Sequence, residues 1–291
     1  MDRTDLAWFA YSGGYLAVSL IFLFIAKLLF DLVTPYCLKK ELTEKDNPAF
    51  GVHLAGYLAG LLAIICSVFA GEAVAPSLEQ FTSEMIDVAI YGGLGIALLC
   101  ISGILNDKFV MGRFKCREEI IDRQNTAVAS VSGAAYLGSG LLIAASIYAS
   151  ADLVSVLIFF VLGQLVLIVF CSLYKAVTKY DDLEELGEKK NLSAGVAFAG
   201  NLIAYSVILF KGIGVDPISA VEFTLQDRLL NFGYYAIGGV FLLAVGRIIA
   251  DKLFLPSVSL HKEIVEDRNL NAGIVEGTLV LSIGLVLFFC L

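Results

Sequence analysis

The sequence predicts an all-α fold: a polytopic transmembrane helical bundle with eight spans, arranged as two parallel four-helix repeats. Three observations support this prediction. The chain of 291 residues is 58% hydrophobic and only 16% charged, whereas soluble domains carry about 25% charged residues. It contains eight apolar runs of the roughly 20 residues that a helix needs to cross a bilayer. It also matches itself without a gap at an offset of 144 residues, which places Asn47 on Asn191 and Asp107 on Asp251.

The eight predicted spans alternate with polar connectors. They cover residues 9–33, 48–71, 86–106, 126–148, 154–176, 192–211, 229–250 and 270–291. The self-match divides the chain into a first four-helix transmembrane repeat over residues 1–150 and a second over residues 151–291. Because each repeat contains an even number of spans, both should have the same orientation, related by an axis along the membrane normal.

The connectors differ in charge from one side of the membrane to the other. Most of the 20 Lys and Arg residues lie in the four connectors that follow spans one, three, five and seven. Short connectors rich in Lys and Arg stay in the cytoplasm. The sequence therefore predicts a multi-pass protein of the bacterial inner (plasma) membrane, with its basic loops in the cytoplasm and both termini outside, in the periplasm.

The two repeats resemble each other most closely at their cytoplasmic ends. Asp107 and Lys108 close the third span, and Asp251 and Lys252 close the seventh. These four residues form a predicted cytoplasmic rim. Near the same end of the seventh span, Arg247 lies four residues before Asp251, the spacing of a salt bridge along one helix.

Each even-numbered span follows an asparagine: Asn47, Asn125, Asn191 and Asn269. Asparagine is a strong helix N-cap because its side chain accepts hydrogen bonds from the free N–H groups of the first turn. Pro48, directly after the first of them, suits the first position of a helix. Two interpretations stay open: four separate helix caps, or a polar ring at a cytoplasmic mouth.

The stretches that enter the second and eighth spans carry a family resemblance. They read Asp46-Asn-Pro-Ala-Phe-Gly-Val-His-Leu-Ala-Gly56 and Glu266-Asp-Arg-Asn-Leu-Asn-Ala-Gly-Ile-Val-Glu-Gly277. With the polar segments before them, they resemble the bacterial multi-pass membrane proteins whose unit is known as domain of unknown function 350 and occurs in pairs. The resemblance covers nearly the whole chain and implies the membrane fold and the duplication. The family supplies no established activity or catalytic residues.

The even-numbered spans carry small residues at helical spacing, including Gly56 with Gly60 and Gly273 with Gly277. Such stripes let helix backbones approach each other, because lipid provides no hydrophobic drive for helix association. We expect them to pack helices within one chain. A dimer face, or a pore lined by backbone, stays open as an alternative.

Among the ionisable residues within the apolar spans, three stand out: Lys27, His53 and Glu276. A charge at such depth costs on the order of 2.5–3.5 kcal/mol, so each is a candidate for function. The helix rise places all three at a similar depth below the cytoplasmic ends of their spans. They are therefore predicted to form an intramembrane polar cluster in which Lys27 or His53 is the partner of Glu276. The alternatives are that Lys27 extends to the interface and that His53 is a neutral packing residue.

The same three positions are where the repeats disagree. At the offset of 144 residues, Lys27 corresponds to Cys171, His53 to Ala197, and Glu276 to Ser132. Each ionisable residue therefore occurs in one repeat only. The three residues are therefore interpreted as additions to a symmetric scaffold. They are the first candidates for a functional role.

Several functions are disfavoured by what the sequence lacks. No C-x-x-C pair, nucleophile–base pair or phosphate-binding loop is present, so no enzyme, metal site or cofactor is expected. The net charge of −8 and a pI near 4.8 disfavour a nucleic-acid partner. The expected partners are the lipid bilayer, and further a second copy of the chain or a cytoplasmic protein.

Two functions remain. The first is a channel or transporter for a small ion or solute, with the polar residues near Glu276 serving the permeant species. The alternative is a non-transporting membrane scaffold or stress-response partner, acting through the charged cytoplasmic loops at residues 107–124 and 251–268.

Overall fold

The computed structural model describes residues 3–34, 37–70, 77–150, 152–178, 180–214, 224–254 and 259–290, and these residues contain helices but no strand. Within these described residues, eight helical segments are long and apolar enough to cross a membrane. They are Trp8–Leu32, Pro48–Phe69, Leu78–Phe109, Thr126–Ala149, Leu153–Val177, Leu192–Gly212, Leu225–Ile249 and Leu270–Cys290. The predicted fold class, an all-α bundle with eight spans, is confirmed.

The third span begins earlier than the sequence suggested. Helix α3 (Leu78–Asp87) continues through one π-helical turn, η2 (Val88–Gly92), into α4 (Gly93–Phe109). Ser77 caps this stretch by accepting a hydrogen bond from the Gln80 N–H at 3.1 Å. Because α3 is polar, apolar-run length alone places the start of the helix several residues too late.

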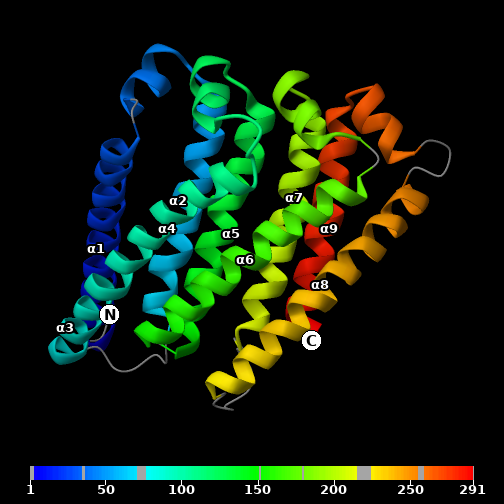
Figure 1. The fold of residues 1–291 in the computed structure, drawn as a ribbon. Coiled ribbons are helices and arrows are strands. Elements are labelled where there is room, and N and C mark those ends of the chain that lie inside the picture. Colours follow the sequence, from blue (N-terminus) through cyan, green and yellow to red (C-terminus); the bar gives the residue numbers. More distant parts are fainter. Residues whose placement is uncertain are drawn as a thin grey trace.

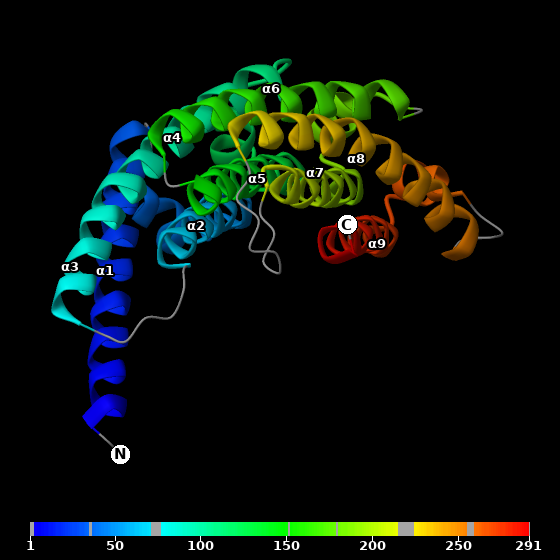
Figure 2. The same cartoon turned by 90° about the horizontal axis from the view of Figure 1, so that it is seen from below.

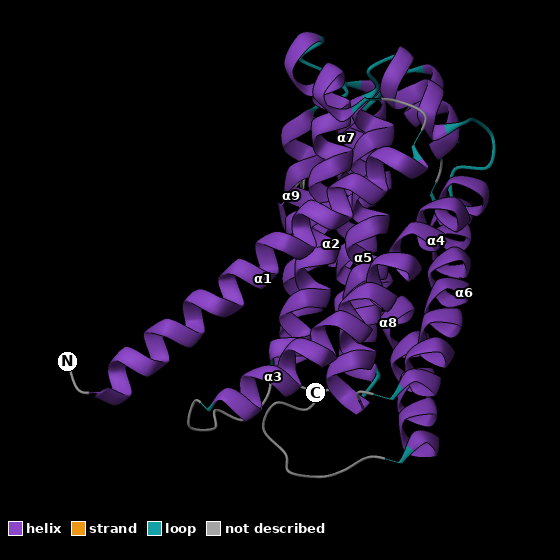
Figure 3. Cartoon of the chain, turned by 90° about the vertical axis from the view of Figure 1, so that its left-hand side faces the viewer, coloured by secondary structure: helices purple, strands orange, loops and turns teal. Residues whose placement is uncertain are grey.

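The helices form two layers (Figures 1 and 2). Helices α2 (Pro48–Phe69), α5 (Thr126–Ser150), α7 (Leu192–Gly212) and α9 (Leu270–Cys290) lie side by side in that order. We call these four helices the central row. Helices α4, α6 (Leu153–Val177) and α8 (Leu225–Phe254) cover one face of it. Helix α1 (Arg3–Val33) lies at the α2 end and leans away from the other helices (Figure 3).

Neighbouring helices of the central row pack closely, because glycines of one helix contact the backbone of the next. A Cβ added at Gly60 would lie 2.7 Å from the Tyr136 carbonyl oxygen of α5, and one at Gly195 would lie 2.6 Å from that of Ala127. Gly200 of α7 and Gly277 of α9 face each other in the same way. The prediction that the small-residue stripes pack helices within one chain is confirmed.

Each helix of the central row is the second arm of a hairpin. The connecting segments each contain one π-helical turn: η1 (Lys40–Glu44), η3 (Glu118–Asp122), η4 (Glu184–Glu188) and η5 (Lys262–Glu266). All four turns lie at the same end of the bundle, at the top of Figure 1, and both described ends of the chain lie at the other. We call the end that carries the turns the polar rim. The two repeats therefore consist of four helical hairpins, whose π-helical turns all lie at the polar rim.

Candidate functional site

The four asparagines at the polar rim cap their helices. The Asn47 side chain accepts a hydrogen bond from the Phe50 N–H at 3.1 Å, and the Asn191 side chain accepts from the Ala194 N–H at 3.3 Å. The residue before each asparagine has a positive φ of 47–50°: Asp46, Gln124, Lys190 and Arg268. This left-handed residue turns the chain from the π-helical turn into the next helix.

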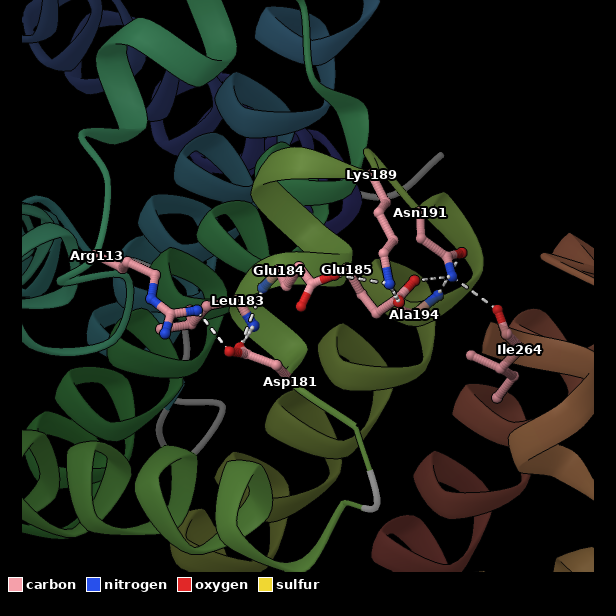
Figure 4. Close-up of polar contacts among 9 residues, drawn as sticks. All are labelled: Arg113, Asp181, Leu183, Glu184, Glu185, Lys189, Asn191, Ala194 and Ile264. Carbon is pink, nitrogen blue, oxygen red and sulfur yellow. Dashed lines mark hydrogen bonds and ion pairs between the residues drawn. The ribbon is translucent and has the colours of Figure 1, made fainter. Parts of the chain in front are cut away.

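The same asparagines also tie successive hairpins together. Asn47 Nδ2 donates to the Ile120 carbonyl at 2.9 Å, and Asn125 Nδ2 donates to the Leu186 carbonyl at 2.7 Å. Asn191 Nδ2 donates to the Ile264 carbonyl at 2.8 Å (Figure 4). Each bond runs from one hairpin to the π-helical turn of the next one. We call this series the asparagine ladder; it follows the central row as a line from α2 to α9.

A glutamate six residues earlier completes each rung of the ladder. Asn47 also donates to Glu41 at 3.1 Å, Asn125 to Glu119 at 2.8 Å, Asn191 to Glu185 at 2.9 Å and Asn269 to Glu263 at 2.8 Å. In the first three hairpins this carboxylate is buried and pairs with a basic side chain four residues later: Lys45, Arg123 and Lys189. Asp267 occupies that place in the fourth hairpin.

The pKa of Glu41 shows what the rung does to the carboxylate. Burial by itself would raise its pKa, but the hydrogen bonds from Lys45 and Asn47 outweigh burial and hold the pKa below its usual value. Glu41 is therefore an ionised acceptor at neutral pH. A charged acceptor makes the hydrogen bond from the asparagine amide stronger than one between neutral groups.

The first repeat contains a polar pocket of about 170 Å³ below the rim. His53 lies in it, 6% exposed, with Nδ1 3.0 Å from the Ser132 hydroxyl oxygen. The Tyr136 ring meets His53 edge-on at 5.3 Å between ring centroids. Gly103 lies below the Tyr136 hydroxyl, where a Cβ would collide with it. The remaining lining residues are Phe30, Thr34, Tyr57, Cys100, Ile104, Asp107, Cys116, Arg117 and Ile120.

The second repeat holds an ion pair at the equivalent place. The Arg247 guanidinium Nε lies 2.9 Å from Glu276 Oε1, and the Glu276 side chain is fully buried. The Arg247 guanidinium also lies over the Tyr174 ring, 5.3 Å from its centroid. At the offset of 144 residues, Arg247 corresponds to Gly103 and Glu276 corresponds to Ser132. The cavity beside Arg247 measures only about 70 Å³.

The substitutions between the two places compensate each other in volume. Where the first repeat has Gly103 under Tyr136, the second has Arg247 and Val280, and Val280 is fully buried. The large side chain has moved from one helix of the pair to the other. The four positions that line both cavities are Phe30, Tyr57, Cys100 and Gly103 in the first repeat and Tyr174, Asn201, Ala244 and Arg247 in the second.

The predicted cluster of Lys27, His53 and Glu276 is wrong. Lys27 pairs with Asp31 along α1 at 3.0 Å, His53 contacts Ser132, and Glu276 pairs with Arg247. Helix α9, which carries Glu276, lies at the opposite end of the central row from α1 and α2 (Figure 2). A common depth does not make residues neighbours, because depth leaves the order of the helices undetermined.

The predicted rim residues lie where the connectors begin. Asp107 and Lys108 are exposed, and Asp107 accepts a hydrogen bond from the Cys116 N–H at 3.0 Å. Lys252 is exposed as well. The Asp251 side chain lies outside the described residues, and the Arg247 guanidinium is directed to Glu276 instead. The four-residue spacing predicted that Arg247 pairs with Asp251 on its own helix. Its partner in the structure is Glu276, on α9.

The fold and the rim define a class of protein: a multi-pass helical membrane protein built from a tandem four-helix unit. Residues 6–147 and 148–291 each match the family described as Domain of Unknown Function (DUF350), and the chain belongs to that family. It is similar to a "UPF0719 transmembrane protein" of Aquifex aeolicus (strain VF5), with 26% identity over 269 residues, 90% of this chain and 93% of the relative. No solved structure matches. The resemblance seen in the sequence is confirmed, and the family is uncharacterised.

Proposed function

We propose that this protein carries a small ion or polar solute across the membrane, and that the first-repeat pocket around His53 is where the solute binds. The observation that supports this is the difference between the repeats. The same place below the rim is filled by an ion pair in one repeat and left as a polar cavity in the other. Polar groups inside a membrane are retained where they bind, pair or conduct.

The chemistry of the pocket suits a small polar guest. Each ring nitrogen of His53 either donates or accepts, depending on its tautomer, and the hydroxyl of Ser132 does both. Asp107 and Arg117 bring one charge of each sign to the rim side of the same pocket. A volume of about 170 Å³ accommodates a few molecules the size of water, each of which occupies about 30 Å³ in the liquid. A small hydrated ion fits better than a large substrate.

The central row and helix α1 differ in how tightly they are packed. Glycine contacts hold the central row together backbone to backbone. Helix α1, in contrast, buries only 11% of its spanning window. Segments with few buried contacts open at the lowest free energy. We therefore propose that α1 shifts against a rigid central row, and that the polar rim faces the cytoplasm.

The test is to rebuild the second-repeat ion pair inside the first repeat. The triple variant Gly103→Arg, Ser132→Glu and Tyr136→Val places the residues of Arg247, Glu276 and Val280 at the matching positions. Proteoliposomes are assayed with dyes for protons, potassium and chloride. We expect the wild type to conduct at least one of these ions. We expect the triple variant, and separately His53→Ala, to lose that flux while retaining helicity and a monodisperse elution profile.

Either of two results would overturn the proposal: no flux of any of the three ions through the wild type, or unchanged flux in both variants. The matched control is the reverse substitution in the second repeat, Arg247→Gly, Glu276→Ser and Val280→Tyr. It leaves the His53 pocket untouched, so the flux is expected to persist.

One observation favours the alternative of a non-transporting scaffold. Arg113 in the connector of the first repeat pairs with Asp181 of the second at 2.6 Å, and both side chains are about half exposed (Figure 4). A charged surface that spans both repeats would suit a cytoplasmic protein partner. If Arg113→Glu removes the cellular phenotype while no ion flux is found for the wild type, the scaffold replaces the carrier.

A further inference from the structure

The contact between α5 and α7 joins the two repeats, and the repeat offset shows which residues stand at the equivalent positions elsewhere in the row. In the middle of the row, Gly195 of α7 meets Ala127 of α5 and Ser206 of α7 meets Gly138 of α5. Both pairs have counterparts 144 residues away: Gly51 and Leu62 on α2, and Asn271 and Ser282 on α9. The helices that carry these counterparts, α2 and α9, lie at opposite ends of the row (Figure 2).

The α2 end of the row has an open face. A Cβ at Gly195 would lie 2.6 Å from the Ala127 carbonyl oxygen, but one at the equivalent Gly51 would meet nothing within 4 Å. Ala55 and Cys66 are exposed on the same side of α2, and Leu62 is 42% exposed. We call Gly51, Ala55 and Leu62 the α2 face. These residues occupy the positions of Gly195, Ala199 and Ser206 on α7. Cys66, one turn further along α2, lines a cavity of about 420 Å³ together with Phe288 of α9.

The α9 end has an open face of its own. Asn271, Thr278 and Ser282 are exposed and Leu285 is 43% exposed. We call these four residues the α9 face. The face differs from the lipid-exposed side of α6, which consists of residues such as Leu157, Val161 and Leu165. Asparagine, serine and threonine within a membrane pack against other helices, where small size and hydrogen bonding help.

The asparagine ladder is open at the same two ends. The carbonyl residues that receive a rung, Ile120, Leu186 and Ile264, are buried. Leu42, at the same position in the first hairpin, is partly exposed, and no described hairpin precedes it. Asn269 is likewise partly exposed, whereas the other three asparagines are buried, and no described hairpin follows it. One end of the row has an extra acceptor position and the other has an extra donor.

We propose that the α9 face of one copy packs on the α2 face of a second copy, so that the central row continues from chain to chain. Asn269 of one copy then donates to the Leu42 carbonyl of the second, as Asn125 does to Leu186. The contact joins two different faces, so it is heterologous, and it closes into a ring or extends as a filament. The argument for a second copy is continuity: the two faces are equivalent to those that meet once within the chain, between α5 and α7, and the two ladder ends continue a hydrogen bond made three times within it.

Cysteine cross-linking tests the register directly. In a background with the six native cysteines replaced, one tagged chain carries Ser282→Cys and a differently tagged chain carries Leu62→Cys. Coexpression in membranes followed by oxidation is expected to yield a covalent dimer with both tags. The pair Asn271→Cys with Gly51→Cys is expected to do the same. The matched control, Ser282→Cys with Leu165→Cys on the lipid-exposed side of α6, is expected to give no dimer.

A glycine comparison provides the second test. Gly51→Leu adds a side chain to open space, so helicity and thermal unfolding of the single chain should stay unchanged while the oligomer is lost in gentle detergent. Gly195→Leu adds the same side chain against the Ala127 backbone and should unfold the chain itself. The proposal is overturned if neither cross-linked pair forms, if Ser282→Cys or Leu62→Cys dimerises only with itself, or if Gly51→Leu leaves the oligomer intact.

Discussion

The two repeats agree at the polar rim and disagree about 10 Å below it. At the rim, Asn47 and Asn191 make the same three contacts: to a glutamate, to the carbonyl of the next hairpin, and to the first turn of their own helix. Below it, the first repeat has a cavity beside His53 and the second has the buried pair of Arg247 with Glu276. Duplication preserved what holds the hairpins together and let the interior diverge.

This contrast separates the scaffold of the unit from the positions that have diverged. A contact that both repeats retain serves the fold, since each repeat needs it for the same reason. At a position where one repeat has a cavity and the other has an ion pair, the fold does not require the same residues in both repeats. Substitutions at matched positions of the two repeats should therefore differ in their effects.

The largest effect is expected for Glu276→Ala. It leaves the Arg247 guanidinium buried without its carboxylate, and removing one partner of a buried ion pair costs about 3–5 kcal/mol. The free energy of unfolding is measured by denaturation in mixed micelles. The control is the double variant Arg247→Gly with Glu276→Ser, which restores the first-repeat residues and should cost less than Glu276→Ala alone. If the double variant is the less stable of the two, the pair does not stabilise the second repeat as a unit.

The next effect concerns the part that the repeats share. Asn47→Ala and Asn191→Ala each remove a helix cap, worth about 1 kcal/mol, and a hydrogen bond to a charged carboxylate, worth about 1.5–3 kcal/mol. The two losses should be equal in denaturation, because the contacts are equal. Asn269→Ala should cost less in the monomer, since its rung lacks a following hairpin among the described residues. A loss for Asn47→Ala that differs widely from that for Asn191→Ala would contradict a shared scaffold.

A smaller effect is expected from pH, in the second repeat alone. Burial raises the pKa of Asp182 to about 6 from an ordinary value of 3.8. Between about pH 4 and 6 the folded protein therefore holds a proton that the unfolded chain has released. The stabilisation is complete below pH 4 and is lost as pH rises through 6, by on the order of 3 kcal/mol.

Asp182→Asn is expected to flatten this pH dependence in thermal unfolding between pH 4 and 7. The corresponding first-repeat position is Leu38, which has no group to titrate. A slope that persists in Asp182→Asn would assign the titration to another carboxylate.

The sequence predicted the parts of this molecule that repeat along the chain. Span length and hydropathy predicted the eight helices, and the asparagine at each entry predicted the caps, because a cap is a contact within three residues. The bond from Asn125 to the Leu186 carbonyl could not be predicted in the same way. Its acceptor is backbone, which every residue carries, so nothing in the side chains indicates it.

The error over Glu276 has a different origin. Depth along a helix follows from residue number, but the neighbours of α9 depend on how eight helices pack, and Lys27 proved to be on the far side of the bundle. The self-match did contain the needed signal. Arg247 and Glu276 both replace small residues, Gly103 and Ser132, of the other repeat. Two changes of opposite charge at matched depth indicate a pair.

The smallest effect is expected for Ser132→Ala, the counterpart of Glu276→Ala. It removes the hydroxyl that contacts His53 Nδ1 at 3.0 Å, a neutral hydrogen bond worth about 1 kcal/mol. The cavity of about 170 Å³ beside it has room for a water molecule that would restore the contact. Denaturation should therefore show a loss of about 1 kcal/mol or less. The same position would then carry a structural ion pair in one repeat and a nearly neutral substitution in the other. If Ser132→Ala instead destabilised as much as Glu276→Ala, the His53 pocket would be part of the scaffold and the proposed binding site would lose its support.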